Sequence, residues 1–208
     1  MKLIEKTVAQ LLEAFRSSEP TPGGGSASAL AGSVGAALLA MVSGLPKPRA
    51  AAESDLQRLR AAGARSAELS ARLATLIDRD SDAYQMVVAA YRLPKGTEAE
   101  KAARNARVQD ALRAATDAPL EVMQACRDAI EQAALVAAHG NRSASSDVQV
   151  ALELLGAGLR GAALNVAINL GSVKDEDYAG RLRRAVADLS ADADRAAAAA
   201  RVRLTEDV

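Results

Sequence analysis

An uncharged tract constrains this sequence most: residues 20 to 46 carry no ionisable side chain, although 25% of the chain is charged. The tract begins with a glycine triplet at residues 23–25. About 20 uncharged residues are enough to cross a bilayer as a helix. Glycines and serines recur along the tract, however, and no Trp or Tyr anchors its ends. We therefore favour a helix packed inside the protein over a membrane span.

Acidic residues precede the tract, whereas the apolar segment of a secretory signal follows only a short basic leader. Glu5, Glu13 and Glu19 all lie before it, so we expect a cytoplasmic protein. One cysteine and one histidine cannot form the usual zinc ligand sets, and no metal is expected. The formal net charge is zero, which argues against a nucleic-acid partner.

Composition and turn signals predict an all-α fold. Aromatic residues make up 2% of the chain, and β-branched residues never alternate with polar ones over a useful length. Six helices are predicted. The first starts after Thr7, the second starts at about Ser26, and the third ends near Tyr91. The remaining three span Thr97 to Gly140 with a kink or restart at Pro119, Ser145 or Ser146 to Leu170, and Ser172 to Leu204. We expect one domain, residues 1–208, folded as a multi-helix antiparallel bundle.

An acid interrupts the apolar side of the third predicted helix. The apolar positions follow helical steps of four and three: Leu73, Ile77, Tyr84, Val87 and Tyr91. Asp80 occupies the position between Ile77 and Tyr84, whereas Asp78 and Asp82 point to more solvated faces. A carboxylate among apolar side chains is a candidate for perturbed acid–base chemistry. The alternative is a core acid paired with an arginine of another helix.

Three further polar groups stand out. Asn165 and Asn169 lie one turn apart on an apolar helix and suit either the edge of a heterocycle or an interhelical hydrogen-bond pair. The segment HGNRSASSDV gathers Asn141 and Asp147 at a helix start, where most such clusters are caps. The amides of the triplet can receive an anionic group at a helix N-terminus, although close packing explains the glycines equally well.

Four ordered segments resemble the cyclodeaminase/cyclohydrolase family that acts on one-carbon derivatives of tetrahydrofolate. They are PTPGGGSASALAGSVGAALLAMV, DRDSDAYQMVVAAYRLPK, HGNRSASSDVQVA and GAALNVAINLGSVKD. The resemblance implies an all-helical homodimer that binds a folate among its helices, with no cofactor beyond this substrate. Departures from the family pattern lie in SGLPKPRAAAESD and at Gln149, where relatives often have glycine; both can alter the mouth of the site.

The resemblance also implies roles for single residues. Asp80 would be the general base, and Lys95 the basic residue that orients it or contacts the folate. Substrate would be bound by Gly23, Gly24, Gly25, Ser26, Asn141, Asp147, Asn165 and Asn169. Lys47, Arg49 and Lys174 are candidates for the glutamyl tail of the folate.

Two activities and one non-catalytic function fit this resemblance. Because the 208 residues hold no formiminotransferase domain beside this one, we favour a methenyltetrahydrofolate cyclohydrolase over a formimidoyltetrahydrofolate cyclodeaminase. A helical folate-binding or interaction module that lacks the chemistry is the third alternative.

Overall fold

The computed structural model describes residues 1–46 and 52–205, and this part of the chain is helical with no strand. The elements are η1 (Leu3–Glu5), α1 (Val8–Arg16), α2 (Gly24–Gly44), α3 (Glu53–Tyr91), α4 (Glu98–His139), η2 (Arg142–Ala144), α5 (Ser145–Leu170) and α6 (Glu176–Thr205). The predicted all-α class is confirmed. That residues 1–208 form a single domain stays a prediction.

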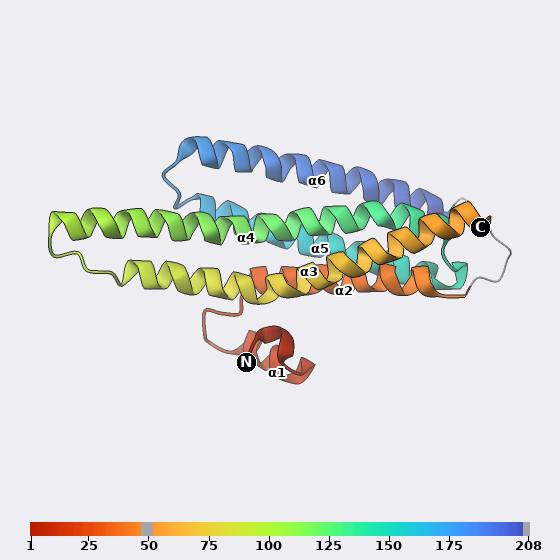
Figure 1. Ribbon diagram of the computed structural model, residues 1–208, viewed down its shortest axis with the longest axis horizontal. Helices are drawn as coiled ribbons and strands as arrows, with labels where there is room; N and C mark the ends of the chain where they lie inside the picture. Colours follow the sequence, from red (N-terminus) through yellow and green to blue (C-terminus); the bar gives the residue numbers. More distant parts are fainter. Residues whose placement is uncertain (47–51, 206–208) are drawn as a thin grey trace.

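Helices α2 to α6 form an elongated antiparallel bundle in which the chain reverses direction at each connection (Figure 1). Helix α4 is central and packs against α2, α3, α5 and α6. Helix α1 lies outside the bundle, below α2 and α3 in Figure 1. The N-terminal segment is tied to α3 because the carboxylate of Asp78 accepts hydrogen bonds from the backbone N–H groups of Leu3 and Ile4. Asp78 is therefore half-buried, contrary to the expected solvated position.

The uncharged tract forms α2, whose small residues allow neighbouring helices to come very close. Gly32, Gly35 and Ala36 are buried between α3 and α5. A side chain at Gly35 would lie 2.8 Å from the carbonyl oxygen of Ala151 on α5. By length and composition, α2 and the segment Arg142–Leu170 could each cross a membrane, but half of the apolar window in α2 is buried within the bundle.

Replacing Gly158 with alanine should destabilise the bundle at this close contact. The new Cβ would lie 2.7 Å from the carbonyl oxygen of Ser28 and 3.0 Å from the nitrogen of Gly32. Because both atoms belong to the α2 backbone, α2 and α5 must separate, which should cost about 1 to 3 kcal/mol. Urea unfolding measures the change. Gly180→Ala in α6 is the control: its Cβ meets nothing within 4 Å, so it should stabilise the protein by about 0.5 to 1 kcal/mol. Equal stabilities for the two variants would contradict the close packing of α2 on α5.

Several predicted helix ends differ in detail. The predicted helix starts at Thr7 and Thr97 are confirmed, each with a capping box, but α4 runs through Pro119 without restarting. Helix α4 ends at His139, and its C-cap residue Gly140 is extended, with φ −72° and ψ −177°, rather than left-handed. The turn η2 intervenes after α4, and its cap is Asn141, whose side chain accepts from the backbone N–H of Ser143 at 2.9 Å.

Candidate active site

The carboxylate of Asp80 lies against the N-terminus of α2. Its Oδ2 accepts a 3.0 Å hydrogen bond from the backbone N–H of Ser26 and lies 3.2 Å from the Ser26 hydroxyl. That hydroxyl is fully buried and also donates to the carbonyl oxygen of Ile77 at 2.8 Å. Ser26 therefore sits behind Asp80 and fixes it to the first turn of α2, where the helix dipole favours negative charge. Within the described residues, Oδ1 of Asp80 has no hydrogen-bond partner.

Gly25 makes this approach possible. A Cβ at Gly25 would lie 2.0 Å from Oδ1 of Asp80 and 2.4 Å from its carboxyl carbon. No side chain fits there while the carboxylate keeps its position. The φ angle of Gly25 is negative like that of every glycine in the described chain, so the requirement is for space and does not come from backbone conformation. The triplet thus serves to bring a helix N-terminus into contact with an acid.

The environment of Asp80 favours proton uptake. Burial raises its pKa above the ordinary value of 3.8, while the backbone and side-chain hydrogen bonds from Ser26 oppose this shift without cancelling it. No arginine or lysine forms an ion pair with Asp80 in the described part of the chain. This observation argues against the alternative interpretation of Asp80 as a core acid paired with an arginine. A carboxylate with a raised pKa, one fixed oxygen and one free oxygen is suited to accept a proton.

Asn165 and Asn169 reach the same region from the C-terminal half of α5. The Asn165 amide donates to the carbonyl oxygen of Gly161 at 2.9 Å, and that of Asn169 donates to Ala115 on α4 at 2.7 Å. Each side chain therefore donates one N–H to a hydrogen bond within the protein, and its second N–H and its carbonyl oxygen can still form hydrogen bonds. A donor and an acceptor from each amide are left for a ligand.

A pocket of about 300 Å³ brings these groups together. It is lined by Pro20, Thr21, Gly23, Gly24, Asp80, Tyr84, Val87, Leu112, Ala115, Asn165 and Asn169. A second pocket of about 680 Å³ shares Pro20, Thr21 and Tyr84 with the first and extends along α3 to Gln85 and Arg92. The side chains of Tyr84 and Tyr91 are 41% and 49% exposed, so the apolar stripe of α3 is buried only as far as Asp80 and then faces open pockets.

Lys95 and the Asp147 segment lie away from this pocket. Lys95 is exposed in the connection between α3 and α4, beyond the eleven residues that separate Asp80 from the end of α3, about 16 Å along the helix. Within this chain it cannot orient Asp80, contrary to the expectation. Asp147 lies 18 residues before Asn165 on α5, about 27 Å away. The prediction that Asp147 and Asn141 shape the Asp80 cavity therefore fails within one chain, because most of the length of α5 separates these two residues from Asn165 and Asn169 in the cavity.

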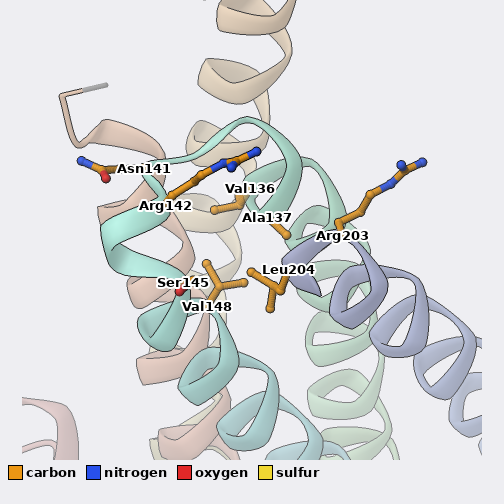
Figure 2. A pocket seen from close by; sticks show the side chains of 8 residues that line it. All are labelled: Val136, Ala137, Asn141, Arg142, Ser145, Val148, Arg203 and Leu204. Carbon is orange, nitrogen blue, oxygen red and sulfur yellow. The ribbon is translucent and has the colours of Figure 1, made fainter. Parts of the chain in front are cut away.

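Asn141 instead belongs to another pocket, at the opposite end of the bundle. This pocket is lined by Val136, Ala137, Asn141, Arg142, Ser145, Val148, Arg203 and Leu204. Figure 2 shows the side chains of Arg142 and Arg203 along its upper edge, whereas that of Asn141 turns away from it. The Asn141 amide donates to the carbonyl oxygen of Pro46 at 2.6 Å, so this side chain holds the end of α2 to the start of η2.

Sequence patterns did not predict three other residues that line the pocket. Thr21, Leu112 and Ala115 line the pocket, yet none interrupts a pattern or carries chemistry that would draw attention to it. Lys174 is exposed and does not line either pocket near Asp80. Lys47 and Arg49 lie outside the described residues.

Comparisons with known proteins place the chain in a family. Residues 7–188 match the family model described as formiminotransferase-cyclodeaminase. This match covers most of the chain, which therefore belongs to the formiminotransferase-cyclodeaminase family. The resemblance seen in the four sequence segments is confirmed.

Individual relatives differ in how much of their length corresponds to this chain. A methenyltetrahydrofolate cyclohydrolase from Methylorubrum extorquens is 42% identical over 177 residues, which cover 84% of each protein. A formimidoyltransferase-cyclodeaminase from Sus scrofa is 33% identical over 190 residues, which cover 90% of this chain and 35% of that protein. The crystal structure of a formiminotetrahydrofolate cyclodeaminase from Thermotoga maritima superposes with a TM-score of 0.85 over 96% of both chains. At 23% identity, this last likeness establishes the shared fold.

Proposed function

We propose that the protein is a methenyltetrahydrofolate cyclohydrolase that converts 5,10-methenyltetrahydrofolate to 10-formyltetrahydrofolate. The observation that carries the proposal is Asp80, a carboxylate in a pocket, fixed through Oδ2 and free at Oδ1. The extent of the match to the Methylorubrum extorquens cyclohydrolase, which covers most of both chains, supports the choice of reaction. No cofactor beyond the folate substrate is part of the proposal.

The proposed reaction begins when Oδ1 of Asp80 takes a proton from a water molecule. The water oxygen bonds to the cationic one-carbon bridge and gives a neutral tetrahedral centre. The bond from this carbon to N5 then breaks as Asp80 returns its proton to N5. The hydroxyl proton leaves to solvent as the formyl carbonyl forms, so one proton is released per turnover. A positioned general base of this kind contributes about 10² to 10⁴-fold to a rate.

The remaining groups of the pocket would bind and orient the folate. The free donors and acceptors of Asn165 and Asn169 match the hydrogen-bonding edge of a pterin. Tyr84 borders both pockets, and Arg92 lines the second. We propose that the aminobenzoyl group lies along Tyr84 and that the glutamyl carboxylate points toward Arg92, because carboxylates pair well with a guanidinium group.

The protein would act as a cytoplasmic homodimer with no membrane or nucleic-acid partner. Exposed apolar side chains on α2 and α5 support the dimer: Val34 and Met41 are 44% and 43% exposed, and Leu164 and Ile168 are 73% and 75% exposed. Exposed apolar side chains on two neighbouring helices favour an interaction site.

The experiment that tests the proposed reaction offers the purified protein each folate separately. Loss of the methenyl absorbance is followed with 5,10-methenyltetrahydrofolate, and ammonia release with 5-formimidoyltetrahydrofolate. We expect methenyl hydrolysis well above the uncatalysed rate. Rapid ammonia release without accelerated methenyl hydrolysis would instead identify a cyclodeaminase. Folate binding without either reaction would identify a binding module.

The pH dependence of the reaction should report the state of Asp80. A general base must be deprotonated, so kcat/KM should fall on the acid side as pH drops through the pKa of this carboxyl. Because burial raises that pKa, the acid limb should lie above the ordinary value of 3.8. The measurement is a pH profile of methenyl hydrolysis, corrected for the uncatalysed rate. The residual activity of Asp80→Asn should lack this limb, and an unchanged limb in that variant would assign it to another group.

A further inference from the structure

The first 22 residues form an arm outside the bundle, and we call this segment the N-terminal arm. It consists of η1, α1 and the segment that leads into α2, and it lies below α2 and α3 in Figure 1. Within α1 only Leu11 is buried, whereas Val8 and Leu12 are exposed. Among the described residues, α1 makes no extensive contact with any helix of the bundle. The position of the arm therefore depends on its two ends.

The carboxylate of Asp78 holds the first end of the arm against α3. Its Oδ1 accepts a 2.6 Å hydrogen bond from the backbone N–H of Leu3, and its Oδ2 accepts a 3.4 Å bond from that of Ile4. Both donors belong to the first turn of η1, where N–H groups have no partner within the helix. Hydrogen bonds to a carboxylate are stronger than neutral ones, and the side chain of Leu3 packs against the main core beside them.

The second end of the arm forms part of the folate site. Pro20 and Thr21 line the Asp80 pocket. Together with Glu19, they also line the second pocket of about 680 Å³, and the other residues that line this second pocket belong to α3. The second pocket is thus a space between the arm and α3, and it keeps its shape only while the arm lies beside that helix.

A stiff connection joins the two ends of the arm. Helix α1 begins with a capping box at Thr7, and the hydroxyl of Ser17 donates to the carbonyl oxygen of Ala14 at its other end. Pro20 and Pro22 then fix two φ angles in the segment that follows. Because few of its bonds can rotate freely, the arm should move as one piece. A contact that holds η1 therefore also holds the pocket wall.

We propose that Asp78 is a positioning residue that holds the N-terminal arm against α3 and thereby keeps the wall of the folate site in place. Asp78 and Asp80 lie two residues apart on α3, so one turn of this helix supports both the wall and the general base. Asp80 itself is fixed by Ser26 of α2, and its position does not depend on the arm. The inference rests on the proposed function and adds a residue that controls substrate affinity without acting in the chemical step.

Replacing Asp78 with alanine should raise KM for 5,10-methenyltetrahydrofolate and leave kcat nearly unchanged. The apparent affinity falls in proportion to the fraction of protein in the binding-competent state. If the arm lies in place for about a tenth of the time, KM rises about tenfold. The contact between Asp80 and Ser26 persists, so kcat should stay within about twofold of the wild-type value. Asp82→Asn, at an exposed position of α3, is the control and should change neither constant.

A variant on the other side of the same hydrogen bond provides a second test. Leu3→Pro removes the N–H that donates to Asp78. The preceding residue, Lys2, is extended with φ −66° and ψ 154°, as suits a residue before proline, and the first position of a helix accepts proline. Leu3→Ala keeps the N–H and controls for the lost packing, so it should raise KM less.

Combining the two changes shows whether they act through one contact. The double variant Leu3→Pro/Asp78→Ala should have a KM close to that of Asp78→Ala, because both changes remove the same interaction. A fully additive effect of the two changes would overturn the proposal. A wild-type KM in Asp78→Ala would also overturn it, as would a fall in kcat with KM unchanged, since Asp78 would then act on the chemical step.

Limited proteolysis tests the contact independently of catalysis. Trypsin can cut after Arg16, which is exposed at the end of α1, when the arm leaves α3. Asp78→Ala should be cut there at least about tenfold faster than the wild type, because cleavage follows the population of the open form. Addition of 5-formyltetrahydrofolate, which has the pterin and the tail but no cationic bridge, should slow the cleavage of the wild type. Equal cleavage of the two proteins without folate would reject the role of Asp78.

The same assay separates a failure of this inference from a failure of the proposed function. Faster cleavage of Asp78→Ala in a protein that neither turns over 5,10-methenyltetrahydrofolate nor is protected by 5-formyltetrahydrofolate would reject the folate site. The attachment of the arm by Asp78 would then stand without its role in folate binding. Normal folate turnover with equal cleavage and equal KM would leave the proposed function standing and reject the inference.

Discussion

Replacing Asp80 with asparagine should lower the kcat of methenyl hydrolysis by about 10² to 10⁴-fold. Asparagine has nearly the same shape and can still accept the Ser26 N–H, but its amide cannot take a proton from water at neutral pH. KM should change much less than kcat, because the pocket keeps its shape. Steady-state kinetics that follow the methenyl absorbance give both constants.

The stability of the same variant separates a catalytic acid from a structural one. The folded state raises the pKa of Asp80, so the protonated carboxyl stabilises the fold at low pH, and this contribution is lost as pH rises through the folded pKa. At neutral pH the wild type must keep a buried charge, and Asp80→Asn should melt at the same temperature or higher. Asp82→Asn, at an exposed position on the same helix, should leave kcat and melting unchanged. A large fall in the melting temperature of Asp80→Asn would show that the acid mainly holds the fold together.

Adding one methyl group at Gly25 should be nearly as damaging. The Cβ of alanine would lie 2.0 Å from Oδ1 of Asp80, so the carboxylate must move away from the first turn of α2. A displacement of about 1 Å in a catalytic group can cost about 100-fold in rate, and we expect a loss of at least this size in kcat/KM. Folding should survive, because the helical backbone of α2 accepts alanine.

A second glycine of α2 provides the control for this variant. Gly44 is exposed near the end of the helix, and a Cβ there meets nothing within 4 Å. Gly44→Ala should therefore retain full activity. Circular dichroism and thermal melting of both variants show whether the loss in Gly25→Ala comes from the site alone. Near wild-type activity in Gly25→Ala would mean that Asp80 works from a position other than the one seen against α2.

The sequence predicted the helices and the central acid because both depend on local patterns. Capping residues and apolar spacing are properties of a few neighbouring residues, so the start of α1 and the end of α3 were placed well. Asp80 was found because it interrupts a stripe that is otherwise apolar. The Asn165 and Asn169 pair was found for the same reason, and the pocket contains all three residues.

The features that the sequence could not predict depend on which residues lie close together in the folded chain. Lys95 was associated with Asp80 because it follows the same helix, yet a helix of this length carries the chain away by 1.5 Å at every residue. The contact between Asp78 and the backbone of Leu3 joins residues 75 positions apart, and no local sequence pattern predicts it. The extended conformation of Gly140 likewise depends on how η2 packs against the end of α2.

The absence of an arginine or lysine paired with Asp80, within the part of the chain that the structure describes, affects the end of the proposed catalytic cycle. The pocket offers a lone negative charge, and 5,10-methenyltetrahydrofolate brings a positive one, so the two attract each other before reaction. Hydrolysis turns the cationic ring into an uncharged formamide, and this attraction disappears with the product. The same carboxylate that activates water would therefore favour the cationic substrate over the uncharged product, and an added counter-ion beside it would reduce this difference.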